Sequence, residues 1–285
     1  MNNTLYVKAG LALLTLLTII TTEKPVYNAD SVAQGDLVIM PRRVLLDNAK
    51  RTQELNIANT GTDSAKYLIS VIQYRMLENG GFQEITEPDA GQNFATKNFR
   101  FFPRSVTLAP NESQTIKVQA INTSELPAGE YRSHLYFRAV AEDAVIDESA
   151  KIPKSLSVQL TPTFGIAIPV IIRTGNTNLN VKIDKPLFTI DNKGLPQLDM
   201  TFNRTGNISV YGDVKVEYIS EKGKAIQVGI AKGLAVYTPN NNRKLLLTLD
   251  KNPSVDYHKG KLKITYLTSS EIKPEVITST QIDLI

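Results

Sequence analysis

The residue types that most often carry out catalysis are sparse in this chain. Cysteine is absent from the 285 residues, so thiol nucleophiles, thiolate metal sites and disulfides are excluded. The two histidines are His134, inside a predicted strand, and His258, in the turn "DYHKG", and neither has a metal-ligand spacing such as HExxH. GxSxG, phosphate-loop and calcium-loop motifs are missing. The sequence therefore predicts a protein that is not an enzyme and uses no cofactor or metal.

One acidic segment could in principle supply paired carboxylates. "AEDAVIDESAKIPK", residues 141–154, is polar, contains proline and has no strong period. Carboxylates that are close only in sequence more often belong to a solvated loop than to an acid–base pair. We therefore expect a long mobile loop here.

The next stretch indicates binding rather than catalysis. "KSLSVQLTPTFGIAIPVIIR" runs from Lys154 to Arg173, and every second residue from Leu156 to Ile172 is apolar. A period of two predicts a strand, because successive side chains point to opposite faces. The pattern is much longer than an ordinary strand of about 5–6 residues.

Two prolines predict where this long strand lies. Pro162 and Pro169 cannot donate ladder hydrogen bonds, so the strand belongs at the edge of a sheet. An exposed apolar edge can add a strand to the sheet of a partner, or its apolar side chains can simply pack into their own core. We expect 154–161 to be lent to a partner and 164–172 to be buried in its own domain.

The rest of the chain reads as strands and turns. Apolar runs recur roughly every 8–12 residues and are separated by turn segments such as "NTGTDS" and "NGG". This spacing is typical of β-sandwiches. We predict an all-β protein with two sandwich domains, an N-terminal domain at 34–175 and a C-terminal domain at 176–285, with the boundary near Gly175.

The N-terminus predicts export. Lys8 precedes "AGLALLTLLTII", an apolar run too short to span a membrane and typical of a secretory signal peptide. We expect cleavage after Ala33, giving a signal peptide at 1–33, with Ala29 as a second option and an uncleaved anchor as the alternative. No later segment is long enough for stable membrane insertion. The net charge is +4, but the lysines and arginines form no cluster in the sequence, which argues against nucleic acid as a partner.

Four segments together resemble the PapD-like periplasmic chaperones of pilus and fimbrial assembly. They are "PRRVLLDNAKRTQELNIANTG", "FFPRSVTLAPNESQTIKV", "LPAGEYRSHLYFRAV" and "FGIAIPVIIRTG", and they occur in family order between Asp36 and Gly175. The resemblance implies two immunoglobulin-like domains in an L-shaped arrangement. It implies a periplasmic chaperone that donates its edge strand, here 154–168, to an incomplete pilin-type subunit and delivers it to an outer-membrane usher.

The resemblance also assigns roles to individual residues. Arg43 matches the arginine that holds the C-terminal carboxylate of the subunit, and strand alternation lets only one of Arg42 and Arg43 point into that site. Arg173 matches the arginine that helps fix the two domains. The donor residues that match are Leu156, Val158 and Leu160, extended by Phe164 and Ile166.

One position departs from the family pattern. The family has a lysine in its seventh strand as a second carboxylate anchor, and this chain has Pro169 there, or Ala167 if the register moves by two. Neither side chain binds a carboxylate. Either another basic residue substitutes, for which Arg104 and Lys154 are candidates, or the subunit terminus is held differently. The chain is identified as a divergent member of the family.

Other functions remain open at this stage. One alternative is a secreted structural or adhesive β-sandwich protein of a surface assembly, which would self-associate stably. Another is a glycan-binding module or hydrolase on a sandwich scaffold, which would bind or turn over sugar. For a chaperone, a homodimer that caps the free edge is a further open possibility.

Overall fold

A computed structural model describes residues 37–140, 165–269 and 274–284. All of them belong to one compact unit, Ala33–Ile285. Every regular element in these ranges is a strand, which confirms the all-β prediction. The same ranges contain no helix with the length and hydropathy needed to cross a membrane. The signal peptide, the loop 141–154 and most of the expected donor strand lie outside the described residues.

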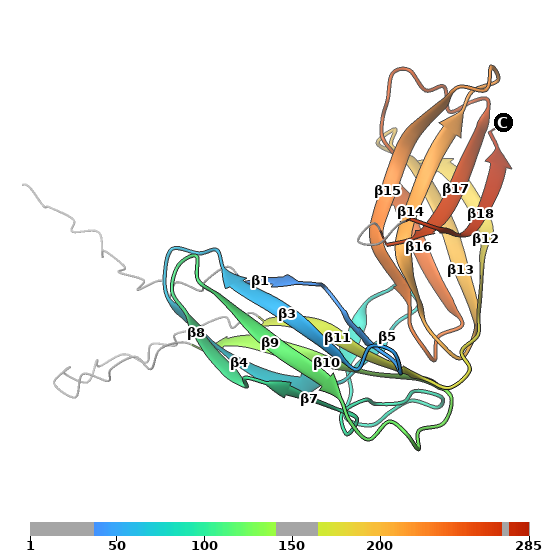
Figure 1. Cartoon of the computed structure of the whole chain (residues 1–285). Coiled ribbons are helices and arrows are strands. Elements are labelled where there is room, and N and C mark those ends of the chain that lie inside the picture. The colour runs from blue at the N-terminus through green and yellow to red at the C-terminus, as the bar shows by residue number, and fades with distance from the viewer. Residues whose placement is uncertain (1–36, 141–164, 270–273, 285) are drawn as a thin grey trace, which may run out of the picture. The chain divides into compact units, whose positions relative to one another are not determined.

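The first sandwich consists of two sheets and a small hairpin (Figure 1). One sheet has the order β1 (Leu37–Met40), β3 (Thr52–Asn59), β9 (Ser113–Ala120), β7 (Phe99–Phe102). The other has the order β2 (Val44–Leu46), β11 (Gly165–Thr174), β10 (Gly129–Val140), β4 (Ala65–Ile72), β8 (Ser105–Leu108). The hairpin pairs β5 (Tyr74–Met76) with β6 (Phe82–Glu84). Two mostly antiparallel sheets with these strand orders form an immunoglobulin-like sandwich.

Period-two patterning builds the core of this sandwich. In "TQELNIAN" of β3 the two apolar alternate residues, Leu55 and Ile57, are fully buried. In β10 the odd positions Leu135 and Phe137 join the same core. Tyr131, also in β10, donates a hydrogen bond from its hydroxyl to the carbonyl of Pro127 at 3.2 Å. Such a tyrosine corner pins the start of a strand to the preceding turn.

The second sandwich also has two sheets. The three-stranded sheet has the order β12 (Leu179–Ile190), β13 (Pro196–Gly206), β16 (Asn242–Thr248). The four-stranded sheet has the order β15 (Ala225–Val236), β14 (Val210–Ile219), β17 (Lys261–Thr268), β18 (Val276–Asp283). Its core contains Leu198, Phe202, Val216 and Tyr266, and the rings of Phe202 and Tyr266 meet edge to face at 5.1 Å. The prediction of a second β-sandwich is thus confirmed.

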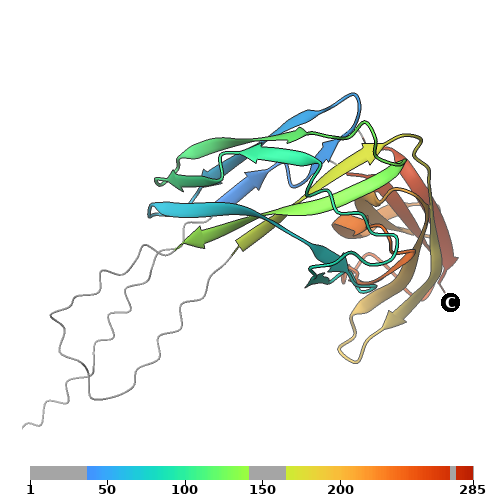
Figure 2. The same cartoon turned by 90° about the horizontal axis from the view of Figure 1, so that it is seen from below.

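Strand β11 has a neighbour along its whole length on one side only. It pairs with β10 from Gly165 to Thr174, and these two strands lie side by side in Figures 1 and 2. On its other side, β2 pairs only with Val170–Ile172. Within the described ranges, residues 165–169 therefore form an open edge, and Pro169 lies on it where no ladder bond is required.

The core of the second sandwich predicts that alanine substitutions at two leucines have very different effects on the free energy of unfolding. Leu198 is fully buried, whereas Leu246 on the neighbouring strand β16 is 60% exposed. Leu198→Ala should lower the free energy of unfolding by about 2–5 kcal/mol, because it leaves a cavity. Leu246→Ala, the matched control, should change it by less than about 0.5 kcal/mol. Urea denaturation followed by circular dichroism measures both, and equal effects would contradict this core.

Candidate binding site formed by both sandwiches

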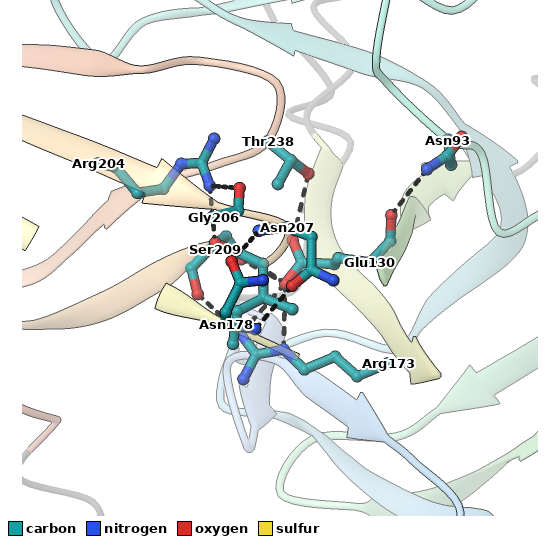
Figure 3. A network of polar contacts seen from close by, with 10 residues as sticks. Asn93, Glu130, Arg173, Asn178, Arg204, Gly206, Asn207, Ser209 and Thr238 are labelled. Atoms are coloured by element: carbon teal, nitrogen blue, oxygen red, sulfur yellow. Dashed lines mark hydrogen bonds and ion pairs between the residues drawn. The ribbon is translucent and has the colours of Figure 1, made fainter. Parts of the chain in front are cut away.

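A buried carboxylate connects the two sandwiches. Glu130, at the start of β10, lies opposite Arg173 of β11 and accepts a hydrogen bond from its Nε at 3.1 Å. The same carboxylate accepts bonds from the backbone N–H and the hydroxyl of Ser209, at 3.0 and 2.7 Å. Arg173 in turn donates to the Ser209 carbonyl at 2.8 Å (Figure 3). A buried ion pair with this many hydrogen bonds offsets the cost of taking its charges out of water.

A second arginine shapes the segment that meets Glu130. Arg204, near the end of β13, donates to the carbonyls of Gly206 and Ile208 at 2.7 and 2.9 Å, as Figure 3 shows for Gly206. These bonds fold the turn that carries Ser209. Burial lowers the pKa of Arg204, while the negative charge of Glu130 opposes that shift.

The hairpin of β5 and β6 also contacts the second sandwich. The Asn240 amide donates to the Met76 carbonyl at 2.7 Å, and the Lys244 N–H donates to the Glu78 carbonyl at 2.7 Å. Gly80, at the tip of this hairpin, lies against Arg243 of β16, and a Cβ at residue 80 would collide with the guanidinium. The hairpin is therefore held with Phe82 beside the rings of His134 and Tyr237.

These contacts enclose a cavity of about 490 Å³, which we call the arginine pocket. Both sandwiches contribute to its wall. The lining residues are Arg42, Tyr74, Met76, Gly80, Phe82, His134, Ala167, Pro169, Gly233, Ala235, Tyr237 and Arg243. Among the described residues that line the pocket, two are arginines and none is an Asp or Glu, so the pocket suits an anion.

The neighbouring arginines Arg42 and Arg43 diverge. Arg42 is exposed and lines the pocket, whereas Arg43 places its guanidinium carbon 4.3 Å from the ring centroid of Tyr211 in β14. The Nε of Arg43 is buried and has no hydrogen-bond partner among the described residues. Both residues lie in the segment between β1 and β2, outside either strand, so the expected strand alternation does not apply to them.

More positive charge lies beside the pocket. Arg132 of β10 is 2% exposed, and its guanidinium carbon lies 4.3 Å from the ring centroid of Tyr237. It donates to the Thr238 carbonyl at 3.2 Å, but its Nε and Nη1 have no partner among the described residues. Arg243 donates to the Ala235 carbonyl at 2.6 Å and its buried Nε has no such partner. Burial is the main cause that lowers the pKa of both arginines.

His134 lies inside the pocket wall as a neutral group. It pairs with Pro169 across β10 and β11, and its ring lies 5.1 Å from the ring of Tyr74. Burial, assisted by the nearby charge of Arg132, lowers its pKa to about 3. Its buried Nδ1 has no hydrogen-bond partner in the described part of the chain. Neutral imidazole keeps one donor and one acceptor for a ligand.

Few of the residues expected to bind a subunit can be placed. Of the donor residues, Leu156, Val158, Leu160 and Phe164 lie outside the described residues, as does the candidate anchor Lys154. Ile166 is 37% exposed at the start of β11. On the same face, Ile168, Val170 and Ile172 are buried in the first sandwich, so the burial predicted for 164–172 holds from Ile168 onward but not at Gly165 and Ile166, which are exposed. The other candidate anchor, Arg104, is exposed, stacks 4.7 Å over the Phe101 ring and does not line the pocket.

Sequence reasoning missed Arg132 and Arg243, and it did not place His134 at a binding site. One signal was present in β10, where Glu130, Arg132 and His134 share one face while apolar residues occupy the other. Charged residues on one face of a strand usually face water, yet all three are buried. The second sandwich covers that face, and Arg243 comes from a strand far along the chain.

Comparison with known proteins found likeness only among solved structures. No protein-family model matches the chain, and no curated protein matches it. The YadV chaperone is 12% identical over 87% of this chain and 100% of its own, with a TM-score of 0.43. The Class 5 fimbriae chaperone CfaA is 14% identical over 88% and 99%, with a TM-score of 0.41. The SafB chaperone, solved with the SafA pilin of Salmonella enterica, is 14% identical over 88% and 97%, with a TM-score of 0.41.

The buried neutral state of His134 predicts a pH-dependent stability. The folded pKa of about 3 lies below the ordinary value of 6.5, so between these values only the unfolded chain binds a proton here. The stability from neutral His134 is complete above pH 6.5 and is lost as the pH falls towards 3, with a slope of up to about 1.4 kcal/mol per pH unit. His134→Gln should remove this contribution.

The free energy of unfolding of the wild type and of the His134→Gln variant is measured between pH 7 and 4. The groups around His134 are the rings of Tyr74 and Phe82 and the guanidinium of Arg132, none of which changes charge in this range. Carboxylates elsewhere titrate in both proteins and cancel in the difference. Parallel curves for the two proteins would show that His134 is not buried as a neutral group.

Proposed function

We propose that this chain is a periplasmic chaperone of the PapD-like family that binds a pilus or fimbrial subunit and lends it the edge strand 154–168. The open edge of β11 carries the proposal. Residues 165–169 pair with β10 on one side, and no described strand covers the other. The apolar face that begins at buried Ile168 continues through half-exposed Ile166 into the alternating sequence before it.

Backbone geometry supports strand addition at this edge. In a strand with a single neighbour, alternate N–H and C=O groups point away from that neighbour and remain available for pairing. A subunit that lacks its own last strand has the complementary groups and an apolar groove. Backbone hydrogen bonds then supply affinity, while Leu156, Val158 and Leu160, extended by Phe164 and Ile166, fill the groove.

The remaining parts of the proposal follow the sequence resemblance. Arg43 holds the C-terminal carboxylate of the subunit, for which its unpartnered Nε is a suitable donor. Arg173 acts with Glu130 to fix the two domains, as their bonds to Ser209 support. The chain is exported through a cleaved signal peptide, acts without catalysis, caps its edge as a homodimer when empty, and delivers the subunit to an outer-membrane usher.

Charged substitutions in the donor strand test the proposal directly. The mature chain should be co-expressed with a small β-rich secreted protein encoded beside it, and their one-to-one complex isolated by co-purification. Val158→Asp and Leu160→Asp should each reduce the recovered complex at least tenfold, because they bury a charge in an apolar groove. Gln159→Asp, on the opposite face of the same strand, is the matched control and should leave it unchanged.

Two outcomes would overturn strand donation. One is that folded Val158→Asp and Leu160→Asp still hold the subunit. The other is that the mature chain forms a stable self-assembly and binds no subunit, which is the behaviour of a structural or adhesive protein.

The role of Arg43 has its own test. Arg43→Ala should weaken the subunit complex by tenfold or more, because the bound carboxylate loses a charged hydrogen-bond partner. Arg100→Ala is the control, since the side chain of Arg100 is exposed on β7 and donates its hydrogen bonds to Gln119. Dissociation constants from isothermal titration should differ between the two variants. Equal values would remove Arg43 from the proposal.

A further inference from the structure

We infer that Tyr136 is a specificity residue for the strand that a subunit adds at the open edge of β11. In this inference, which rests on the proposed function, the ring of Tyr136 extends from β10 over β11 and meets the partner beside Gly165. The partner residue at that place is aromatic or β-branched and packs against the ring.

The register of β10 and β11 places the ring. Tyr136 lies opposite Ala167, and the next pair along the ladder, Arg138 and Gly165, makes Gly165 a diagonal neighbour of Tyr136. Diagonal neighbours on one face of an antiparallel pair are within reach of an aromatic side chain. A Cβ at residue 165 would collide with Cε2, Cζ and the hydroxyl oxygen of Tyr136. The phenol end of the ring therefore lies directly over Gly165 and occupies the place of a side chain there.

The backbone conformation does not explain the glycine at position 165. Its φ angle lies outside the left-handed region, so other residues could adopt the same backbone conformation. A glycine inside a strand weakens the strand and often marks a place where another group approaches closely. The approaching group is the ring of Tyr136, an arrangement in which an aromatic side chain covers a glycine on an edge strand. The glycine thus lets the ring lie low over β11.

The covered glycine lies where a partner strand would add. Residues 165–169 have no described strand on the side away from β10. Neighbouring strands of a sheet are about 4.8 Å apart, so a strand added here would be as close to Gly165 as β10 is. Tyr136 is only half-buried, whereas Leu135 and Phe137 beside it are fully buried. Part of the ring is therefore free to contact the partner.

The small residues around the ring favour a bulky apolar partner residue. On this face of β11, Gly165 has no side chain and Ala167 has only a methyl group, so neither blocks access to the ring from the open edge. Aromatic and β-branched residues pair favourably with an aromatic residue across neighbouring strands. Ile166, a donor residue, points to the opposite face. The contact with Tyr136 is therefore separate from the filling of the subunit groove.

A double-mutant cycle tests whether the ring and the glycine act together on the partner. Dissociation constants of the subunit complex are measured by isothermal titration for the wild type, Tyr136→Ala, Gly165→Ala and the double variant. Each single variant should weaken the complex by about fivefold, because one removes the ring and the other displaces it. The double variant should also lose about fivefold, since both changes act on one contact. Tyr136→Phe keeps the ring and should bind within about twofold of the wild type.

Ser70→Ala is the matched control. Ser70 is exposed and lies opposite Tyr136 on β4, so β10 and β11 separate it from the open edge. This variant should bind as the wild type does. Melting temperatures are measured for all variants, so that loss of the fold is recognised as such.

Photo-crosslinking provides a second measurement if Tyr136→Ala does not fold. Benzoylphenylalanine keeps a ring at position 136 and should crosslink to an aromatic or β-branched residue of the subunit. The same group at position 70 should give no crosslink to the added strand. Mass spectrometry of the digested complex identifies the subunit residue.

The outcomes separate this inference from the proposed function. Wild-type affinity of Tyr136→Ala, losses that multiply in the double variant, or equal losses for Tyr136→Phe and Tyr136→Ala overturn the inference. A crosslink to a glycine or a charged residue overturns the chemistry assigned to the partner. If Val158→Asp abolishes the complex and Tyr136→Ala leaves it intact, only this inference fails. If the wild type forms no complex with a subunit, the proposed function fails and this inference fails with it.

Discussion

The antiparallel pairing of β10 with β11 is the constraint on which the rest of the structure depends. Its register places Glu130 opposite Arg173 and His134 opposite Pro169. The first pair becomes the buried connection to the second sandwich, and the second becomes part of the pocket wall. A slip of one residue would turn each side chain to the other face, so the core, the connection and the pocket depend on the same ladder.

Strand β10 is buried on both faces for two different reasons. Its odd residues fill the core of the first sandwich, whereas Glu130, Arg132 and His134 face the second. Glu130 is fully paired, but Arg132 keeps unpartnered N–H groups. The connection is therefore saturated with hydrogen bonds, whereas the wall of the pocket keeps buried donors without a partner among the described residues. Unfavourable local features of this kind are expected at functional sites.

The sequence predicts the strands and much of the core, because period-two patterning is local. Ile168, Val170, Ile171 and Ile172 are buried as their apolar pattern indicates, Pro169 is half-buried, and both sandwiches are present. The pocket could not be predicted in the same way. Arg132 and Arg243 both act on Tyr237, and they do so only because contacts between the sandwiches bring distant parts of the chain together, which no local pattern encodes. Which of Arg42 and Arg43 lines the pocket also required the actual path of the irregular segment between β1 and β2.

Because residue 169 is a proline, β11 supplies no cation to the pocket at this position. A lysine there would place its charge on β11 itself, independently of the second sandwich. With proline, the cations that face the pocket are Arg42 from the first sandwich and Arg243 from the second. Their spacing then depends on the bonds between Glu130, Arg173 and Ser209 and on the hairpin that contacts Asn240. In this chain, therefore, the contacts that join the sandwiches are also the contacts that position the two arginines of the pocket.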